Sequence, residues 1–180
     1  MDRYLTLFIA HILADFPLQA GVIYEWKTRS KTGLAIHTAI HLIVVFLLFK
    51  PPYTWWPALV TLGVLHFFID WAKLKFPIRP QLLGFIADQV WHALSLIPLA
   101  LFFTEMEPAI PVEFLPADFI ICMAAPILLM FWTYTWDMKS SEPGSQRESV
   151  VKWAQKRLLP ISQIVGFFSV GIIAFQILMN

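Results

Sequence analysis

The sequence has a single cysteine and few charged residues. Because Cys122 is the only cysteine in 180 residues, the chain cannot form an internal disulfide. Charged residues make up 14% of the chain and hydrophobic residues 58%. An average soluble domain has about 25% charged residues. This composition excludes an ordinary water-soluble domain and indicates an integral membrane protein.

Six hydrophobic segments are long enough to cross a bilayer, which needs about 20 residues. They lie near residues 4–22, 33–50, 55–73, 81–103, 117–136 and 160–179. The sequence therefore predicts an all-α integral membrane protein with six transmembrane helices. We expect a four-helix core over residues 1–103. Residues 104–180 are expected to supply two supporting helices and a cytoplasmic interfacial helix near 147–159.

The basic residues are distributed unevenly between the two sides of the predicted membrane. Eleven of the thirteen lysines and arginines fall in the loops after the first, third and fifth segments, and only Arg3 and Lys50 fall on the other side. Loops rich in lysine and arginine face the cytoplasm. The sequence therefore predicts a multi-pass protein with both termini outside.

Each of the first four segments carries one pair of ionisable residues spaced i, i+4. The pairs are His11/Asp15, His37/His41, His66/Asp70 and Asp88/His92, which use all five histidines. Residues at this spacing share one face of a helix. At 1.5 Å per residue, all eight lie about 5–15 Å from the cytoplasmic ends of their helices. Because such groups are costly in hydrocarbon, we expect them to converge on one site.

Two stretches of the chain resemble each other. Residues 11–16 and 66–71 share the pattern H-x-x-x-D-aromatic, and the pair at 37 and 41 corresponds to the pair at 88 and 92. The pattern predicts that the first four helices form two repeated hairpins around a polar centre. A pseudo-two-fold axis along the membrane normal would relate the hairpins.

These motifs resemble a family of bacterial multi-pass membrane proteins, DUF3307. The resemblance rests on H-x-x-x-D-F-x-x-Q from His11, H-x-x-x-H from His37, H-x-x-x-D from His66 and D-Q-x-x-H from Asp88, and it covers about residues 4–103. It implies a location in the bacterial inner (cytoplasmic) membrane. A looser similarity is to small membrane-bound metal-dependent hydrolases, which also place histidine and aspartate on helices.

The eight paired residues form a mixed nitrogen and oxygen ligand set, which suits zinc, manganese or iron. The predicted metal ligands are His11, Asp15, His37, His41, His66, Asp70, Asp88 and His92. Eight ligands are too many for one ion, and two ions about 3.5–4 Å apart would use them. We expect one or two divalent transition metals, with zinc favoured and manganese or iron as alternatives.

Other polar residues are predicted to assist this site. Those near enough along the chain to orient the ligands are Gln19, Thr38, Gln89 and Ser95. Asp15 or Asp88, if not fully engaged as a ligand, is the expected catalytic general base. Lys73 and Arg79 lie at the cytoplasmic mouth, where they could bind an anionic headgroup.

Three classes of function remain compatible with these residues. We favour a metal-dependent hydrolase that acts on a lipid or other amphiphile from the cytoplasmic side, with membrane lipids and the amphiphile as partners and no nucleic acid. The alternatives are an ion or proton transporter that uses the same residues and a structural polar network. Haem ligation by two histidines would leave three aspartates unexplained. A di-iron oxidase is disfavoured because the set has no glutamate.

The outer half of the first four segments offers few polar residues. Beyond His11 and His92, toward the exterior, it contains mainly Thr6, Thr61 and Ser95. A conduction path normally has polar groups on both sides of its binding site. The sequence therefore predicts a blind cavity open to the cytoplasm or the inner leaflet.

Overall fold

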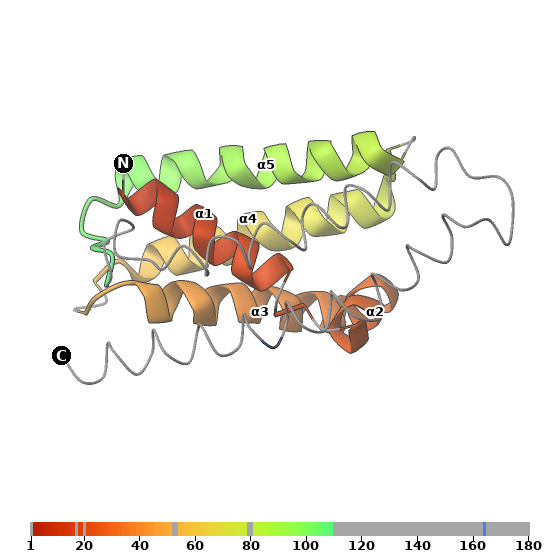
Figure 1. Cartoon of the computed structure of the whole chain (residues 1–180), viewed down its shortest axis with the longest axis horizontal. Helices are drawn as coiled ribbons and strands as arrows, with labels where there is room; N and C mark the ends of the chain where they lie inside the picture. The colour runs from red at the N-terminus through yellow and green to blue at the C-terminus, as the bar shows by residue number, and fades with distance from the viewer. Residues whose placement is uncertain are drawn as a thin grey trace, which may run out of the picture.

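The structure of the chain is a computed structural model that describes residues 2–16, 18–19, 21–51, 54–78 and 81–109, together with residue 164. The helices in this part are α1 (Asp2–Asp15), α2 (Gly21–Arg29), α3 (Lys31–Leu48), α4 (Trp56–Lys75) and α5 (Gln81–Phe102). Four of them, α1, α3, α4 and α5, run along the long axis, and α2 lies at the end opposite the N-terminus (Figure 1). The fold is all-α over these residues, apart from one β-bridge between Phe49 and Pro108.

The four long-axis helices form a ring. Helix α1 packs against α3 and α5, and α4 packs against the same two helices. Helices α1 and α4 run toward the α2 end, whereas α3 and α5 run away from it (Figure 1). Neighbours in the ring are therefore antiparallel and diagonal partners are parallel. Two repeated hairpins would have this arrangement, although the duplication itself stays a prediction.

Three helices are long and apolar enough to cross a membrane, namely α3, α4 and the part of α5 from Leu83 to Phe102. They correspond to the segments predicted at 33–50, 55–73 and 81–103. Large apolar side chains are exposed on their outer surfaces, which is compatible with a membrane protein. Apart from residue 164, the spans expected at 117–136 and 160–179 lie outside the described residues, as does the interfacial helix at 147–159.

The first predicted span differs from the observed helix, because α1 ends at Asp15. Its 14 residues extend about 21 Å, whereas the hydrocarbon core is about 30 Å thick. Proline at position 17 has no amide hydrogen and disfavours a helical conformation at Phe16, which accounts for this end. The carbonyl of Leu13 instead accepts a hydrogen bond from the amide of Leu18 at 3.0 Å. The prediction of one continuous helix over residues 4–22 is wrong.

Helix α2 packs tightly against the start of α3. The hydroxyl of Ser30 caps α3 by accepting a hydrogen bond from the amide of Gly33 at 2.9 Å. A Cβ atom at Gly33 would overlap the backbone carbonyl of Trp26 and lie 2.7 Å from the backbone nitrogen of Lys27. The absence of a side chain at position 33 therefore allows α2 to reach its position.

The opposite end of the bundle is closed by apolar side chains and backbone hydrogen bonds. Phe49, Trp55 and Met106 are each 1% exposed. The amide of Lys50 donates to the carbonyl of Glu107 at 2.8 Å, which joins the loop after α3 to the segment after α5. Among the described residues, these side chains and hydrogen bonds cover the interior at the end away from α2.

We expect Gly33→Ala to displace α2 and lower the stability of the protein. The added methyl group meets backbone atoms that cannot rotate away, so the free energy of unfolding should fall by about 1–3 kcal/mol. Thermal unfolding in detergent micelles measures the change. Gly63→Ala is the control, because its Cβ would lie 3.3 Å from the flexible side chain of Leu42, and should alter stability by less than about 1 kcal/mol. Equal effects of the two substitutions would contradict the proposed role of Gly33.

Candidate metal centre

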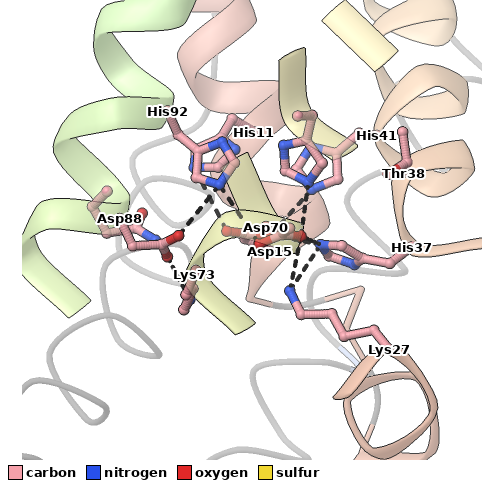
Figure 2. A network of polar contacts seen from close by, with 12 residues as sticks. His11, Asp15, Lys27, His37, Thr38, His41, Asp70, Lys73, Asp88 and His92 are labelled. Carbon is pink, nitrogen blue, oxygen red and sulfur yellow. Dashed lines mark hydrogen bonds and ion pairs between the residues drawn. The ribbon is translucent and has the colours of Figure 1, made fainter. Parts of the chain in front are cut away.

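The eight predicted ligand residues lie together inside the bundle, in two layers, and Figure 2 labels all of them except His66. The histidine layer consists of His11, His41, His66 and His92. The carboxylate layer, one helical turn nearer the α2 end, consists of Asp15, Asp70 and Asp88, with His37 in place of a fourth carboxylate. Every one of the eight side chains is buried. Their convergence matches the expectation from sequence, and their role as metal ligands stays a prediction.

The alternating direction of the helices explains how four different motifs produce two uniform layers. Helices α1 and α4 run toward the α2 end and carry the order H-x-x-x-D, so the histidine lies farther from the α2 end than the aspartate. Helix α5 runs the other way and carries D-x-x-x-H, which restores the same order in space. Helix α3 supplies a histidine to each layer. One helical turn of about 5–6 Å separates the layers.

The imidazoles of the histidine layer crowd around a common point. Ring centroids lie 3.6 Å apart for His41 and His66, 4.4 Å for His66 and His92, and 4.6 Å for His11 and His92. The Nε2 atoms of His11, His66 and His92 are buried without a hydrogen-bond partner. A buried polar atom with no partner is costly. Three such nitrogens facing one another form a set that a cation would satisfy.

Asp15 connects the two layers. Its Oδ1 atom lies 2.9 Å from Nε2 of His37 and 3.1 Å from Nε2 of His41. Its Oδ2 atom lies 3.6 Å from Nε2 of His11. One carboxylate therefore contacts imidazoles from α1 and α3.

Asp88 and Asp70 occupy different surroundings. The Oδ2 atom of Asp88 accepts hydrogen bonds from Nζ of Lys73 at 2.6 Å and from Nε2 of Gln89 at 3.2 Å. Its Oδ1 atom, 3.5 Å from Nε2 of His92, has no hydrogen-bond partner. Asp70 lies within 3.7 Å of imidazoles on α3, α4 and α5. Oδ1 of Asp88 is thus a buried carboxylate oxygen that makes no hydrogen bond and has the imidazole of His92 as its neighbour.

Lys27 is the site residue that sequence reasoning missed. The sequence predicts a cytoplasmic loop at this lysine, whereas the structure places it on α2 with 5% of its surface exposed. Its Nζ atom lies 3.1 Å from Nε2 of His37 and 3.3 Å from Oδ2 of Asp70. No local pattern in the sequence marks this lysine, because its position depends on how α2 packs against α3.

His37 has more neighbours than one nitrogen can satisfy. Its Nε2 atom faces Asp15, Asp70 and Lys27 at 2.9, 3.3 and 3.1 Å. If this nitrogen carries a proton it can donate to one carboxylate but cannot accept from the ammonium group, and the reverse holds for the other tautomer. A metal ion bound at this nitrogen would have to displace Lys27.

Three overlapping groups of described residues could each hold a metal ion. They are Asp15 with His37, His41 and His66; His11 with His66 and His92; and Asp15 with Asp88 and His92. In each group the ligand atoms lie within 4.8 Å of one another. Asp15 is the carboxylate that two groups share. Asp70 belongs to none of the three, and Lys27 is its cationic partner.

The residues expected to assist the site differ in their contacts. Gln89 contacts Asp88, and Gln19 lines a small polar chamber beside Asp15 and Asp88. The hydroxyl of Thr38 donates to the carbonyl of Leu34, and that of Ser95 donates to the carbonyl of His92. These two hydroxyls bond to their own helices. Arg79 lies outside the described residues.

The polar chamber connects the carboxylate layer to the α2 end of the bundle. Its volume is about 60 Å³. It is lined by residues that include Asp15, Asp70 and Asp88, as well as Lys27 and Lys73. Water can therefore approach the three carboxylates from this side of the bundle.

Comparison with known proteins assigns the chain to a family. No curated protein and no solved structure matches the chain. The sequence does match the family described as "Protein of unknown function (DUF3307)" over residues 4–121, a range that contains both layers and Lys27. The chain belongs to the DUF3307 family.

Proposed function

We propose that this protein is a membrane-embedded, metal-dependent hydrolase that acts on a lipid or other amphiphile from the cytoplasmic side. The observation that carries the proposal is the set of three buried Nε2 atoms of His11, His66 and His92, which make no hydrogen bond and lie 3.5–3.6 Å from aspartate oxygens. The proposal includes six transmembrane helices built on two repeated hairpins, both termini outside, and a location in the bacterial inner membrane. It also includes zinc as the favoured metal.

The charges in the site favour a bound cation. The three carboxylates exceed the two ammonium groups of Lys27 and Lys73 by one negative charge, so the site needs one further positive charge, from an imidazolium or from a bound cation. Buried charge that is not compensated is strongly destabilising. A divalent cation would compensate it, and the nitrogen and oxygen donors suit a transition metal.

The residues of the chain have separable parts in the proposed reaction. A bound metal would act as a Lewis acid and activate a water molecule. Asp88 is the favoured general base, since its Oδ1 atom makes no hydrogen bond, its nearest reported neighbour is the imidazole of His92 at 3.5 Å, and the residue lines the polar chamber. Asp15 is better suited to hold metal, because it belongs to two of the ligand groups.

An apolar layer on the side of the histidines away from α2 favours an enzyme over a conduction path. One turn beyond the histidine layer, away from α2, each helix contributes a buried apolar residue: Leu7, Val45, Leu62 and Leu96. Thr6 is the buried polar residue in that half of the described bundle, and Thr61 is exposed. A blind site of this kind suits hydrolysis of a molecule that enters and leaves from one side.

We expect purified protein to carry one or two equivalents of a divalent transition metal and Asp15→Asn to lose most of it. The substitution removes the charge that two ligand groups share, so the affinity should fall by at least about tenfold. Elemental analysis after dialysis measures the content. Glu25→Gln is the control, since this carboxylate is 65% exposed on α2. Full metal loading of the Asp15→Asn variant would reject the site.

Lys27→Met should have opposite effects with and without metal. In the presence of a chelator the variant loses the cation beside Asp70, which should cost about 3–5 kcal/mol of stability. Added zinc should restore the lost stability and bind more tightly than to the parent, because His37 is no longer in contact with an ammonium group. Thermal unfolding with and without zinc tests both effects. Arg29→Met, at a side chain that is 77% exposed, should behave as the parent. An unchanged zinc affinity would contradict competition between Lys27 and the metal.

Hydrolysis and transport can be separated with the full chain. We expect release of p-nitrophenol from p-nitrophenyl laurate or from dodecyl p-nitrophenyl phosphate, and we expect Asp88→Asn and a chelator each to abolish it. In sealed liposomes the same protein should carry no flux of zinc or protons. If the protein carries a flux that Asp15→Asn abolishes and shows no hydrolysis, the protein is a transporter and the hydrolase proposal is wrong.

A further inference from the structure

A second, larger cavity lies beside the site. It is a groove of about 380 Å³ between α4 and α5, within the range of about 300–1,000 Å³ typical of small-molecule sites. Most of its lining is apolar and includes Phe68, Ile69, Ala87 and Trp91. Such a lining suits a hydrocarbon chain.

The groove and the polar chamber share two residues. Lys73 and Asp88 line both cavities. The Asp88 side chain is 1% exposed, whereas that of Lys73 is 41% exposed, so the lysine covers the carboxylate from outside. The ammonium group of Lys73 therefore lies where apolar lining changes to polar lining. A molecule with one apolar and one polar part would match this change.

Lys73 retains the capacity to bind an anion while it contacts Asp88. An ammonium group has three N–H donors, and the described contacts of Lys73 include one hydrogen bond, to Oδ2 of Asp88. The exposed part of the group can thus contact a second acceptor. Gln89 and Lys27 line the adjoining chamber and add further donors.

We infer that the groove between α4 and α5 binds the hydrocarbon chain of an anionic amphiphile and that Lys73 binds its headgroup. The occupant is a single-chain anion such as an alkyl phosphate, because the described lining forms one apolar groove that ends at the exposed ammonium group of Lys73. This arrangement places the headgroup next to Asp88. The inference rests on the proposed function only for the fate of the bound molecule, since the binding itself needs no metal.

Photolabelling of the full chain tests the inference. The probe is dodecyl phosphate with a diazirine near the end of the chain, and the protein is held in phosphatidylcholine nanodiscs with a chelator. We expect labels on groove residues of α4 and α5, mapped by mass spectrometry. Ala87→Phe, which fills the groove, and Lys73→Gln, which removes the cation, should each reduce labelling about tenfold or more.

Matched variants control for general effects on the protein. Ala39→Phe adds the same side chain at an exposed position of α3, and Lys75→Gln removes a neighbouring exposed lysine; neither residue lines the groove. Both should label as the parent does. Unlabelled dodecyl phosphate should compete at least about tenfold better than neutral dodecyl maltoside.

The possible outcomes separate the two proposals. Labels spread over all exposed apolar surfaces, no label in the groove, or equal competition by dodecyl maltoside would overturn the inference. If the protein still binds zinc in that case, the proposed metal site stands without the groove. Specific labelling of a protein that never binds metal would support the groove as a binding site and contradict the proposal of a metal-dependent hydrolase.

Discussion

The structure depends on one constraint, which is that eight ionisable side chains must be accommodated in an apolar bundle. Each needs a partner or a counter-charge, because water is largely excluded. Along the bundle axis the buried side chains follow an order of polarity. An apolar layer comes first, then four imidazoles, then three carboxylates with His37, and last the ammonium groups of Lys27 and Lys73. The most strongly hydrated groups thus lie nearest the open end, and the apolar layer adjoins the imidazoles.

Both layers could be predicted from the sequence because their positions follow from local quantities. Spacing of i, i+4 fixes a helix face, and counting along each helix fixes depth. The three predicted spans that match α3, α4 and α5 rest on the same kind of information, namely length and composition. The end of α1 was also within reach of sequence reasoning, since proline at position 17 marks it. The length of the hydrophobic segment instead favoured a longer helix.

Lys27 and the groove could not be predicted in this way, because they depend on contacts between helices. Lys27 reaches Asp70 across 43 positions of sequence only because Gly33 lets α2 pack against α3. The groove lies between α4 and α5, and no residue in its apolar lining differs in type from one that faces lipid. Sequence patterns identify faces and depths of single helices, whereas these two features belong to pairs of helices.

The early end of α1 has an electrostatic consequence for the site. A helix carries a partial negative charge of about half an elementary charge at its C-terminus. That terminus lies at Asp15, inside the bundle, and the last turn of α1 contains no basic residue to offset it. A helix that continued to the membrane surface would place this partial charge in water, where it would be screened. By ending within the bundle, the backbone of α1 adds to the attraction of cations toward Asp15 without requiring another buried carboxylate.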